Sequence, residues 1–211
     1  MSMMQKNHKE KKGRNNQKLH LLKEKVNQYD DIAKIGEITR RSFGNNAFDG
    51  ILTMIGVLIG SMSSGVRDPR VVITTGLTTS IAIMISGAWG AYLTETSERK
   101  KSLNELSKST LTDLNGSRIG RASRFAAVAV SLVDGLSPFL GAIVVLIPFF
   151  FSAFFTDVFI LYYTALGVAL LALFALGVWL GHVAEENLYI YGLKTLLAGV
   201  VSMLIGSLLG N

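Results

Sequence analysis

The sequence predicts an all-α polytopic membrane protein with five transmembrane helices. Hydrophobic residues make up 49% of the 211 positions, and the mean hydropathy is +0.39. The charged residues crowd into the first 45 positions and one central segment. A soluble chain spreads its charges along amphipathic elements, whereas a membrane protein separates them from its apolar spans. The chain has no cysteine, so disulfides, thiolate metal sites and thiol nucleophiles are excluded.

The segment before the first span divides into two parts. Residues 1–18 are polar and basic and lack the apolar run of a signal peptide, so we expect a disordered basic tail. Residues 19–41 carry apolar side chains mostly three and four positions apart, which predicts an amphipathic cytoplasmic helix. The periodicity does not choose between the membrane surface and a cytoplasmic loop as the partner of this helix.

Residues 42–211 form the predicted five-helix transmembrane domain. About 20 apolar residues are needed to cross the hydrocarbon core. Apolar stretches of that kind lie at about 46–65, 71–93, 125–151, 158–181 and 193–210. Residues 94–124 are then expected to form a loop between the second and third spans.

The distribution of Lys and Arg predicts the orientation. Nineteen of these residues lie before the first span, between the second and third, and between the fourth and fifth, against two on the other side, Arg67 and Arg70. Under the positive-inside rule this places the N-terminus in the cytoplasm and the C-terminus outside, in a multi-pass protein of the cell membrane. The net charge of +6 is explained by topology and lipid headgroups, so nucleic acid is not expected as a partner.

The third span contains a single acid. Asp134 is the one charged residue between Phe125 and Phe155, and at about 1.5 Å per residue it lies roughly 15 Å along the helix from Arg124. A carboxylate at that depth is costly unless it faces a cavity, a partner or a bound cation, so it is a candidate functional residue. Gly135 and Pro138 follow it and predict a kink or an unwound turn.

The first four spans contain an apparent internal repeat. A shift of 85 residues places Asp49-Gly50 on Asp134-Gly135, and a shift of 90 aligns the Gly-x-Trp motifs of the second and fourth spans and places Glu95 on Glu185. We therefore predict that spans one and two are duplicated as spans three and four in a parallel repeat. The two Asp and two Glu residues would form a polar track from the cytoplasm into the membrane.

Carboxylates are hard oxygen ligands suited to divalent cations and protons. Further candidates are Glu residues near the ends of the spans, a His close to two of them, and a Met on the same helix face of the second span as Glu95. The predicted metal-binding set is Asp49, Asp134, Glu95, Glu185, Glu98, Glu186, His182 and Met84. The alternative is structural: each Asp would satisfy the backbone of a broken helix or a neighbouring hydroxyl, and the Glu residues would be ordinary interfacial charges.

The sequence gives little support for an enzyme. It contains no nucleophile elbow, no zinc-protease helix motif, no P-loop and no dinucleotide fingerprint, so neither catalysis nor a tightly bound cofactor is expected. A non-transporting membrane scaffold, in which the repeated Asp-Gly only shapes broken helices, remains the alternative to a transporter.

Several motifs together resemble the vacuolar iron transporter family. They are Gly36-Glu37 followed by Arg40 or Arg41, Phe48-Asp49-Gly50-Ile51-Leu52-Thr53, Gly76-Leu77, Ile85-Ser86, Tyr92-Leu93, Ser97-Glu98 and Thr195-Leu196-Leu197-Ala198-Gly199. The resemblance covers roughly residues 36–210. It implies a five-span homodimer that moves divalent metal ions, iron or manganese first among them, out of the cytoplasm in exchange for protons. It also implies that Asp49 is a pore carboxylate.

The segment between the second and third spans differs from the family pattern. Members often carry a long loop here, rich in Glu, that collects metal. In this chain the segment has about thirty residues and is basic near its start, at Arg99, Lys100 and Lys101.

Overall fold

The computed structural model describes residues 24, 27–30 and 33–209. Five long helices account for most of them: α2 (Ile35–Ser63), α3 (Pro69–Thr110), α4 (Arg118–Phe150), α5 (Val158–Val183) and α6 (Leu188–Leu209). A short 3₁₀ helix, η1 (Ser152–Phe154), joins α4 to α5. All five long helices are long and apolar enough to cross a membrane. The all-α class and the five spans are therefore confirmed, whereas the internal repeat remains a prediction.

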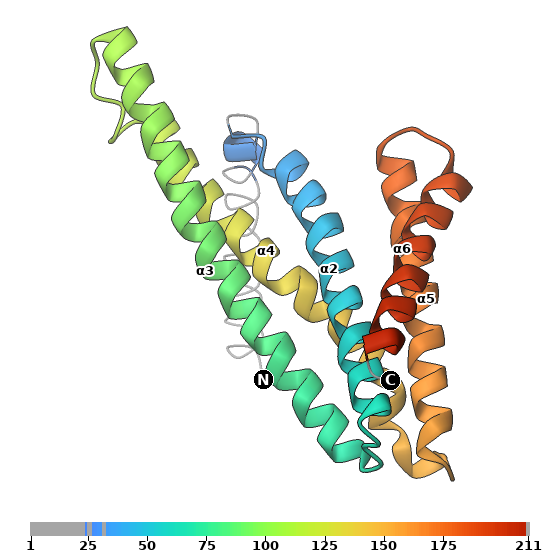
Figure 1. The fold of residues 1–211 in the computed structure, drawn as a ribbon. Coiled ribbons are helices and arrows are strands. Elements are labelled where there is room, and N and C mark those ends of the chain that lie inside the picture. The colour runs from blue at the N-terminus through green and yellow to red at the C-terminus, as the bar shows by residue number, and fades with distance from the viewer. Residues whose placement is uncertain (1–23, 25–26, 31–32, 210–211) are drawn as a thin grey trace, which may run out of the picture.

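The helices form two groups. α2, α3 and α4 make one group, and α5 and α6 form a pair that packs against α2 and α4. α3 packs mainly on α4, α4 packs also on α2, and α5 pairs with α6, while α2 and α3 touch little. Figure 1 shows α3 on one side of the molecule, α2 and α4 in the middle, and the α5–α6 pair on the other side. The core is formed mainly by α2, α4 and α5, with Val72 contributed by α3, and its largest fully buried residues include Met54, Ile55, Leu58, Leu146, Phe149, Tyr162 and Leu173.

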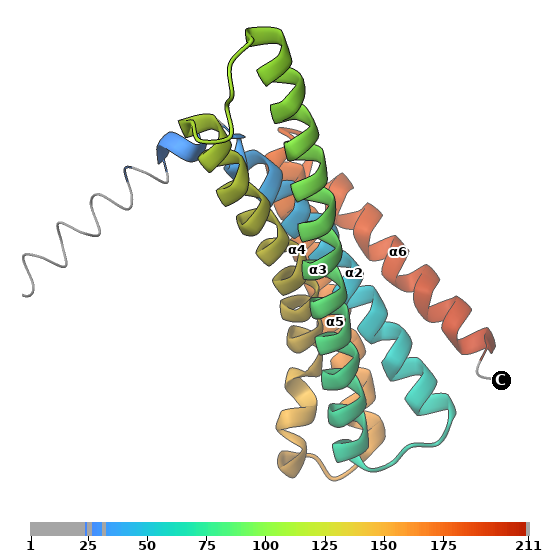
Figure 2. The ribbon, with the colours of Figure 1, turned by 90° about the vertical axis from the view of Figure 1, so that its left-hand side faces the viewer.

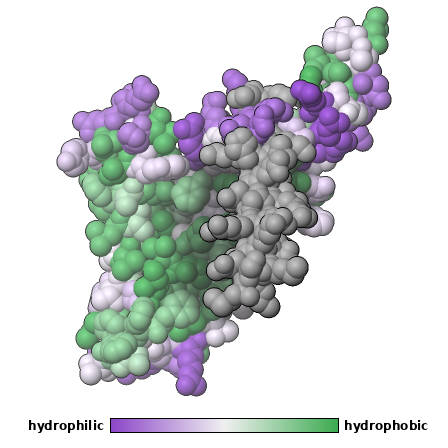
Figure 3. All heavy atoms as spheres, turned by 180° about the vertical axis from the view of Figure 1, so that it is seen from behind, coloured by the Kyte–Doolittle hydropathy of each residue, from purple (hydrophilic) through white to green (hydrophobic). Residues whose placement is uncertain are grey.

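The connections alternate between the two ends of the bundle. The α2–α3 and α4–α5 connections lie at one end, and the α3–α4 and α5–α6 connections lie at the other, together with the start of α2 (Figures 1 and 2). Hydrophilic residues gather at both ends, and hydrophobic residues cover the body on the α5–α6 side in the view of Figure 3. The Lys and Arg residues predicted to be cytoplasmic that the structure describes lie towards one end of the bundle, that of the α3–α4 and α5–α6 connections and the start of α2.

The segment 94–124, predicted to be a loop, is helical over most of its length. α3 continues as a helix to Thr110 and α4 begins at Arg118, so the two form a helical hairpin in which the end of α3 extends beyond the other helices and the connection folds back along it (Figure 2). Residues 94–110 contain no Gly or Pro, and a Glu95–Arg99 pair joins successive turns at 2.7 Å. The loss of hydropathy after Leu93 marks the end of the apolar span and not the end of the helix. With 42 residues, α3 is about 63 Å long, roughly twice the hydrocarbon thickness.

The start of the first span also differs from the prediction. Residues 35–41, assigned to a separate amphipathic helix over 19–41, are continuous with α2. The helix break lies at Lys34, which has a left-handed backbone with φ of 49°. The predicted tail at 1–18 and most of the predicted amphipathic helix lie outside the described residues.

The unwound turn expected near Pro138 is not formed, because α4 stays helical from Arg118 to Phe150. Pro138 has no N–H to donate to the carbonyl of Asp134, one turn earlier. That carbonyl instead packs against Gly87 of α3, where an added Cβ would lie 3.2 Å from the oxygen. Neighbouring helices thus hold α4 together at the proline, as is common in membrane bundles.

Candidate functional site

Both Asp-Gly motifs lie where α4 crosses another helix at close range. A Cβ on Gly50 of α2 would overlap the backbone of Pro138. A Cβ on Gly135 of α4 would lie 2.6 Å from the carbonyl oxygen of Met84 on α3. Only glycine allows such close approach, and the Asp that precedes each Gly is therefore placed beside a helix crossing.

Asp134 lies at the junction of three helices. Its Oδ1 accepts a hydrogen bond of 2.9 Å from Nδ2 of Asn46 on α2. The hydroxyl of Ser42, one turn earlier on α2, is within reach of the same carboxylate, and Glu95 of α3 is close enough to act on it electrostatically. The Asp134 side chain is half-buried, so its charge is shielded from lipid by polar groups on two neighbouring helices.

Glu95 extends this group towards the basic end of the bundle. Its Oε2 accepts a 2.7 Å hydrogen bond from Nε of Arg99, and the exposed fractions of the two side chains are 21% and 16%. We call Ser42, Asn46, Glu95, Arg99 and Asp134 the Asp134 cluster. It combines two carboxylates with one guanidinium, near the end of the spans that faces the α3–α4 connection.

Asp49 belongs to a different face of α2 and is exposed. It lies in a stripe of small and polar residues that no other helix covers among the described residues. This α2 stripe consists of Asn45, Asp49, Thr53, Gly56, Gly60 and Ser63, of which Thr53 is partly buried and the others are exposed. A Cβ added at Gly56 or Gly60 would meet nothing within 4 Å. Polar groups on a membrane span need water or another helix beside them, so this surface is suited to a partner helix or an aqueous path.

The other candidates on α3 divide into two. Met84 is half-buried, and its carbonyl faces Gly135, so the residue lies at the α3–α4 crossing beside Asp134. Glu98 is exposed and is not part of the Asp134 cluster. Of the two, Met84 is therefore the one that the fold brings to the candidate site.

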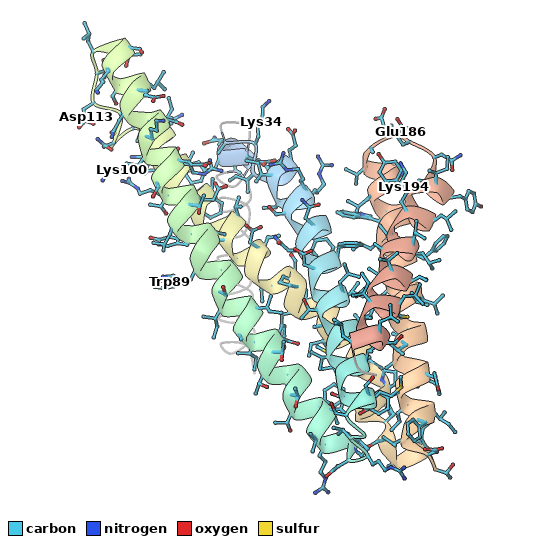
Figure 4. The ribbon with its side chains drawn as sticks, in the orientation of Figure 1. Lys34, Trp89, Lys100, Asp113, Glu186 and Lys194 are labelled. Atoms are coloured by element: carbon cyan, nitrogen blue, oxygen red, sulfur yellow. The ribbon has the colours of Figure 1, made fainter. Side chains whose placement is uncertain are left out.

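His182, Glu185 and Glu186 lie at the α5–α6 turn and are exposed. Glu185 adopts a left-handed backbone with φ of 56°, where its N–H bonds to the carbonyl of His182 at 3.3 Å. The turn lies on the far side of α2 from α3, as the label of Glu186 shows (Figure 4). Within the described residues, no group of three or more Asp, Glu or His side chains gathers closely enough to hold a metal ion.

The predicted track of four acids is therefore divided within one protomer. Asp134 and Glu95 share a cluster, Asp49 lies on the outer face of α2, and Glu185 lies in the α5–α6 turn. Sequence reasoning missed Asn46 and Arg99 as partners of these acids. The signal for Arg99 was its spacing of four residues from Glu95, and the signal for Asn46 was an amide inside an apolar span one turn before Asp49.

Comparisons with known proteins decide the family. The model of the VIT family matches residues 43–115, from the first turns of α2 to the α3–α4 connection. An uncharacterized protein of Methanocaldococcus jannaschii is 32% identical over 173 residues, which cover 81% of this chain and 87% of that protein. The chain belongs to the VIT family. The expected vacuolar iron transporter family is thus confirmed, and membership indicates metal-ion transport across a membrane and not enzymatic catalysis.

The VIT match contains most of the candidate residues on α2 and α3. Asn46, Asp49, Met84, Glu95 and Glu98 all lie between positions 43 and 115. Asp134 lies beyond the matched residues, so its assignment to the site depends on the geometry of the helix junction.

Proposed function

We propose that this VIT-family protein moves divalent metal cations, iron or manganese, out of the cytoplasm in exchange for protons. The observation that carries the proposal is the half-buried Asp134 carboxylate, bonded to Asn46 of α2 and close to Glu95 of α3. An ionisable group inside a span is expensive and typically marks an ion or proton pathway.

The chemistry of the Asp134 cluster suits this cargo. Carboxylate, amide and hydroxyl oxygens are ligands for Mn²⁺ and for other divalent ions of similar hardness, and a thioether such as Met84 adds a softer donor for ferrous iron. Arg99 neutralises Glu95 in the absence of a cation, so an arriving metal ion competes with the guanidinium for that carboxylate. The same carboxylates bind protons on the return path. The metal ions and protons are substrates, and no tightly bound cofactor is required.

We further propose that the functional unit is a homodimer whose protomers meet along the α2 stripe. Gly56 and Gly60 are four residues apart with open space above them, which is the pattern of close helix dimers in membranes. A twofold contact there would remove Asp49 from lipid and place the two copies of Asp49 near one another. The cation pathway would then run between protomers, with Asp49 contributed by both.

The orientation in the membrane follows the charge distribution. Nineteen Lys and Arg residues are assigned to one side and two to the other, so we place the N-terminus in the cytoplasm and the C-terminus outside, in the cell membrane. The Asp134 cluster then lies near the cytoplasmic entrance of the spans, where a cation to be exported first arrives.

The decisive experiment measures metal flux in proteoliposomes that contain a dye sensitive to divalent cations. Wild type is compared with Asp49→Asn and Asp134→Asn, for iron, manganese, cobalt and zinc. Asp157→Asn is the matched control, because Asp157 caps α5 in the α4–α5 connection and Asn preserves that cap. We expect flux in the wild type and in the control, and at least about a tenfold loss in both other variants.

Two results contradict the proposal in different ways. Absence of flux for all four metals, together with no metal-dependent stabilisation on heating, would favour the membrane scaffold. Unchanged flux in Asp49→Asn and Asp134→Asn would leave transport in place and remove these acids from its pathway.

A further inference from the structure

A basic cavity lies between the extension of α3 and the beginning of α4. Its volume is about 390 Å³. Arg99 and Lys100 of α3 and Arg124 of α4 line it, together with Tyr92, Thr96 and Val128. Among the described residues that line it, there is no Asp or Glu. The cavity therefore has the opposite charge from the Glu-rich metal-collecting region expected at this place in the family, and it repels divalent cations.

The cations of the cavity are incompletely neutralised within the described part of the chain. Arg99 pairs with Glu95 through Nε, while Arg124 uses Nη2 to donate to the backbone carbonyl of Asn115 at 3.3 Å. Neither Arg124 nor Lys100 forms an ion pair with a described residue. Guanidinium and ammonium groups converging from two helices are a typical arrangement for binding a phosphate group.

A second observation also points to a ligand. The Oγ1 atom of Thr96 is buried and has no hydrogen-bond partner among the described residues. Thr96 lines the cavity one turn below Arg99 and Lys100. Buried hydroxyls are nearly always bonded, so an unpaired hydroxyl on the wall of a cavity indicates a missing oxygen or nitrogen partner.

The depth of the cavity identifies the kind of molecule that carries the anion. The ring centroids of Trp89 and Tyr92 lie 6.4 Å apart on the outer face of α3. Trp89 is 67% exposed, as residues of an interfacial aromatic belt are (Figure 4). Lys100 lies eleven residues beyond Trp89, about 16 Å further along the helix axis. The lower wall, at Tyr92 and Val128, is apolar and exposed on the span surface. The cavity thus opens downwards to acyl chains and is basic at headgroup level.

We propose that this cavity binds the headgroup of an anionic phospholipid, with the phosphate at Arg99, Lys100 and Arg124 and an acyl chain along Tyr92 and Val128. Thr96 donates its hydroxyl hydrogen to a headgroup oxygen. Basic pockets between helices at a membrane surface recognise anionic lipids in this way.

The test is lipid retention by the full-length protein in detergent, measured by native mass spectrometry and independent of metal transport. The probes are phosphatidylglycerol and phosphatidylcholine with identical acyl chains, and inorganic phosphate as a competitor. The cavity variant is Lys100→Gln with Arg124→Gln. The control, Lys101→Gln with Arg118→Gln, removes the same charge from exposed positions that do not line the cavity. Gel filtration and heating curves establish that each variant folds.

We expect wild type and control to bind phosphatidylglycerol in preference to phosphatidylcholine. The cavity variant should bind phosphatidylglycerol roughly 10- to 30-fold more weakly, and Thr96→Val, which keeps the shape, should weaken binding several-fold. Equal binding of both lipids, or unchanged binding in the cavity variant and in Thr96→Val, overturns the proposal. Displacement of phosphatidylglycerol by inorganic phosphate at equal concentration assigns the cavity to a soluble anion and overturns the lipid assignment. If the cavity variant fails to fold, Thr96→Val and Lys100→Gln alone decide the question.

Discussion

Asn46 on α2 donates a hydrogen bond of 2.9 Å from its Nδ2 to Oδ1 of Asp134 on α4, 88 residues later in the chain. This bond joins two spans at the level where α3 also approaches. It supplies a neutral donor to a carboxylate that also has the Ser42 hydroxyl and the Glu95 carboxylate nearby.

The first prediction concerns the strength of this bond. Asn46→Ala should lower the free energy of unfolding in detergent by about 0.6–1.7 kcal/mol, the range for polar pairs between membrane helices. A double-mutant cycle with Asp134→Ala measures the coupling directly and should give about 0.5 kcal/mol or more. Additive single effects would mean that the two side chains do not interact in the membrane protein.

The second prediction concerns the glycines of the two Asp-Gly motifs. Gly50→Ala and Gly135→Ala each insert a methyl group into the backbone of a neighbouring helix, so each should cost about 1–3 kcal/mol of stability. Gly167→Ala on α5 is the control, because a Cβ there meets nothing within 4 Å, and it should be neutral or stabilising. Thermal unfolding followed by fluorescence gives the comparison, and equal midpoints for all three variants would contradict the close crossings.

The third prediction concerns the proposed dimer. Gly56→Leu and Gly60→Leu should weaken self-association about tenfold or more, since overpacking of a close interface costs about 1–3 kcal/mol. Gly167→Leu introduces the same side chain into open space on another helix and should leave the dimer intact. Light scattering after gel filtration, and cross-linking in lipid, report the mass. A wild-type monomer in both environments would reject the α2 stripe as an interface.

The fourth prediction concerns the α5–α6 turn. Glu185 has a φ of 56°, which is unfavourable for a residue with a Cβ, so Glu185→Gly should stabilise the protein by about 1 kcal/mol. Glu186→Gly, next to it, relieves no such strain and should be neutral or destabilising. Metal flux of the same variants separates the two roles. If Glu185 receives cations, the Glu185→Gly protein will be more stable than wild type but will transport metal more slowly.

The fifth prediction concerns the connection between α3 and α4. The backbone N–H of Asn115, and then its side-chain amide, lower the pKa of the exposed Asp113 carboxyl below its ordinary value. A lowered pKa in the folded state stabilises the turn above the unfolded pKa, and this contribution is lost as the pH falls through the folded value. A carboxyl NMR titration should show the low pKa in wild type and a partial rise in Asn115→Ala. An identical titration in the two proteins would exclude the side-chain contribution.

The membrane class and the number of spans could be predicted from sequence because apolar stretches of the right length are a one-dimensional property. The ends of the helices could not, because hydropathy falls at Leu93 while helix propensity persists to Thr110. The acids were found by their cost in lipid, and the structure places Asp134 half-buried at a helix junction, while its role in metal binding stays a prediction. Its partner Asn46, and the outward direction of Asp49, depend on which faces of α2 and α4 meet, which a short polar motif does not specify.

The hairpin at the ends of α3 and α4 has a practical consequence for imaging. A 22.9 kDa protein largely surrounded by detergent presents few features by which electron-microscope images can be aligned. Residues 111–117 are the short connection between two helices that continue directly into the second and third spans. A rigid domain fused in their place, by two uninterrupted helical junctions, would be oriented with the bundle and would serve as an alignment marker outside the micelle.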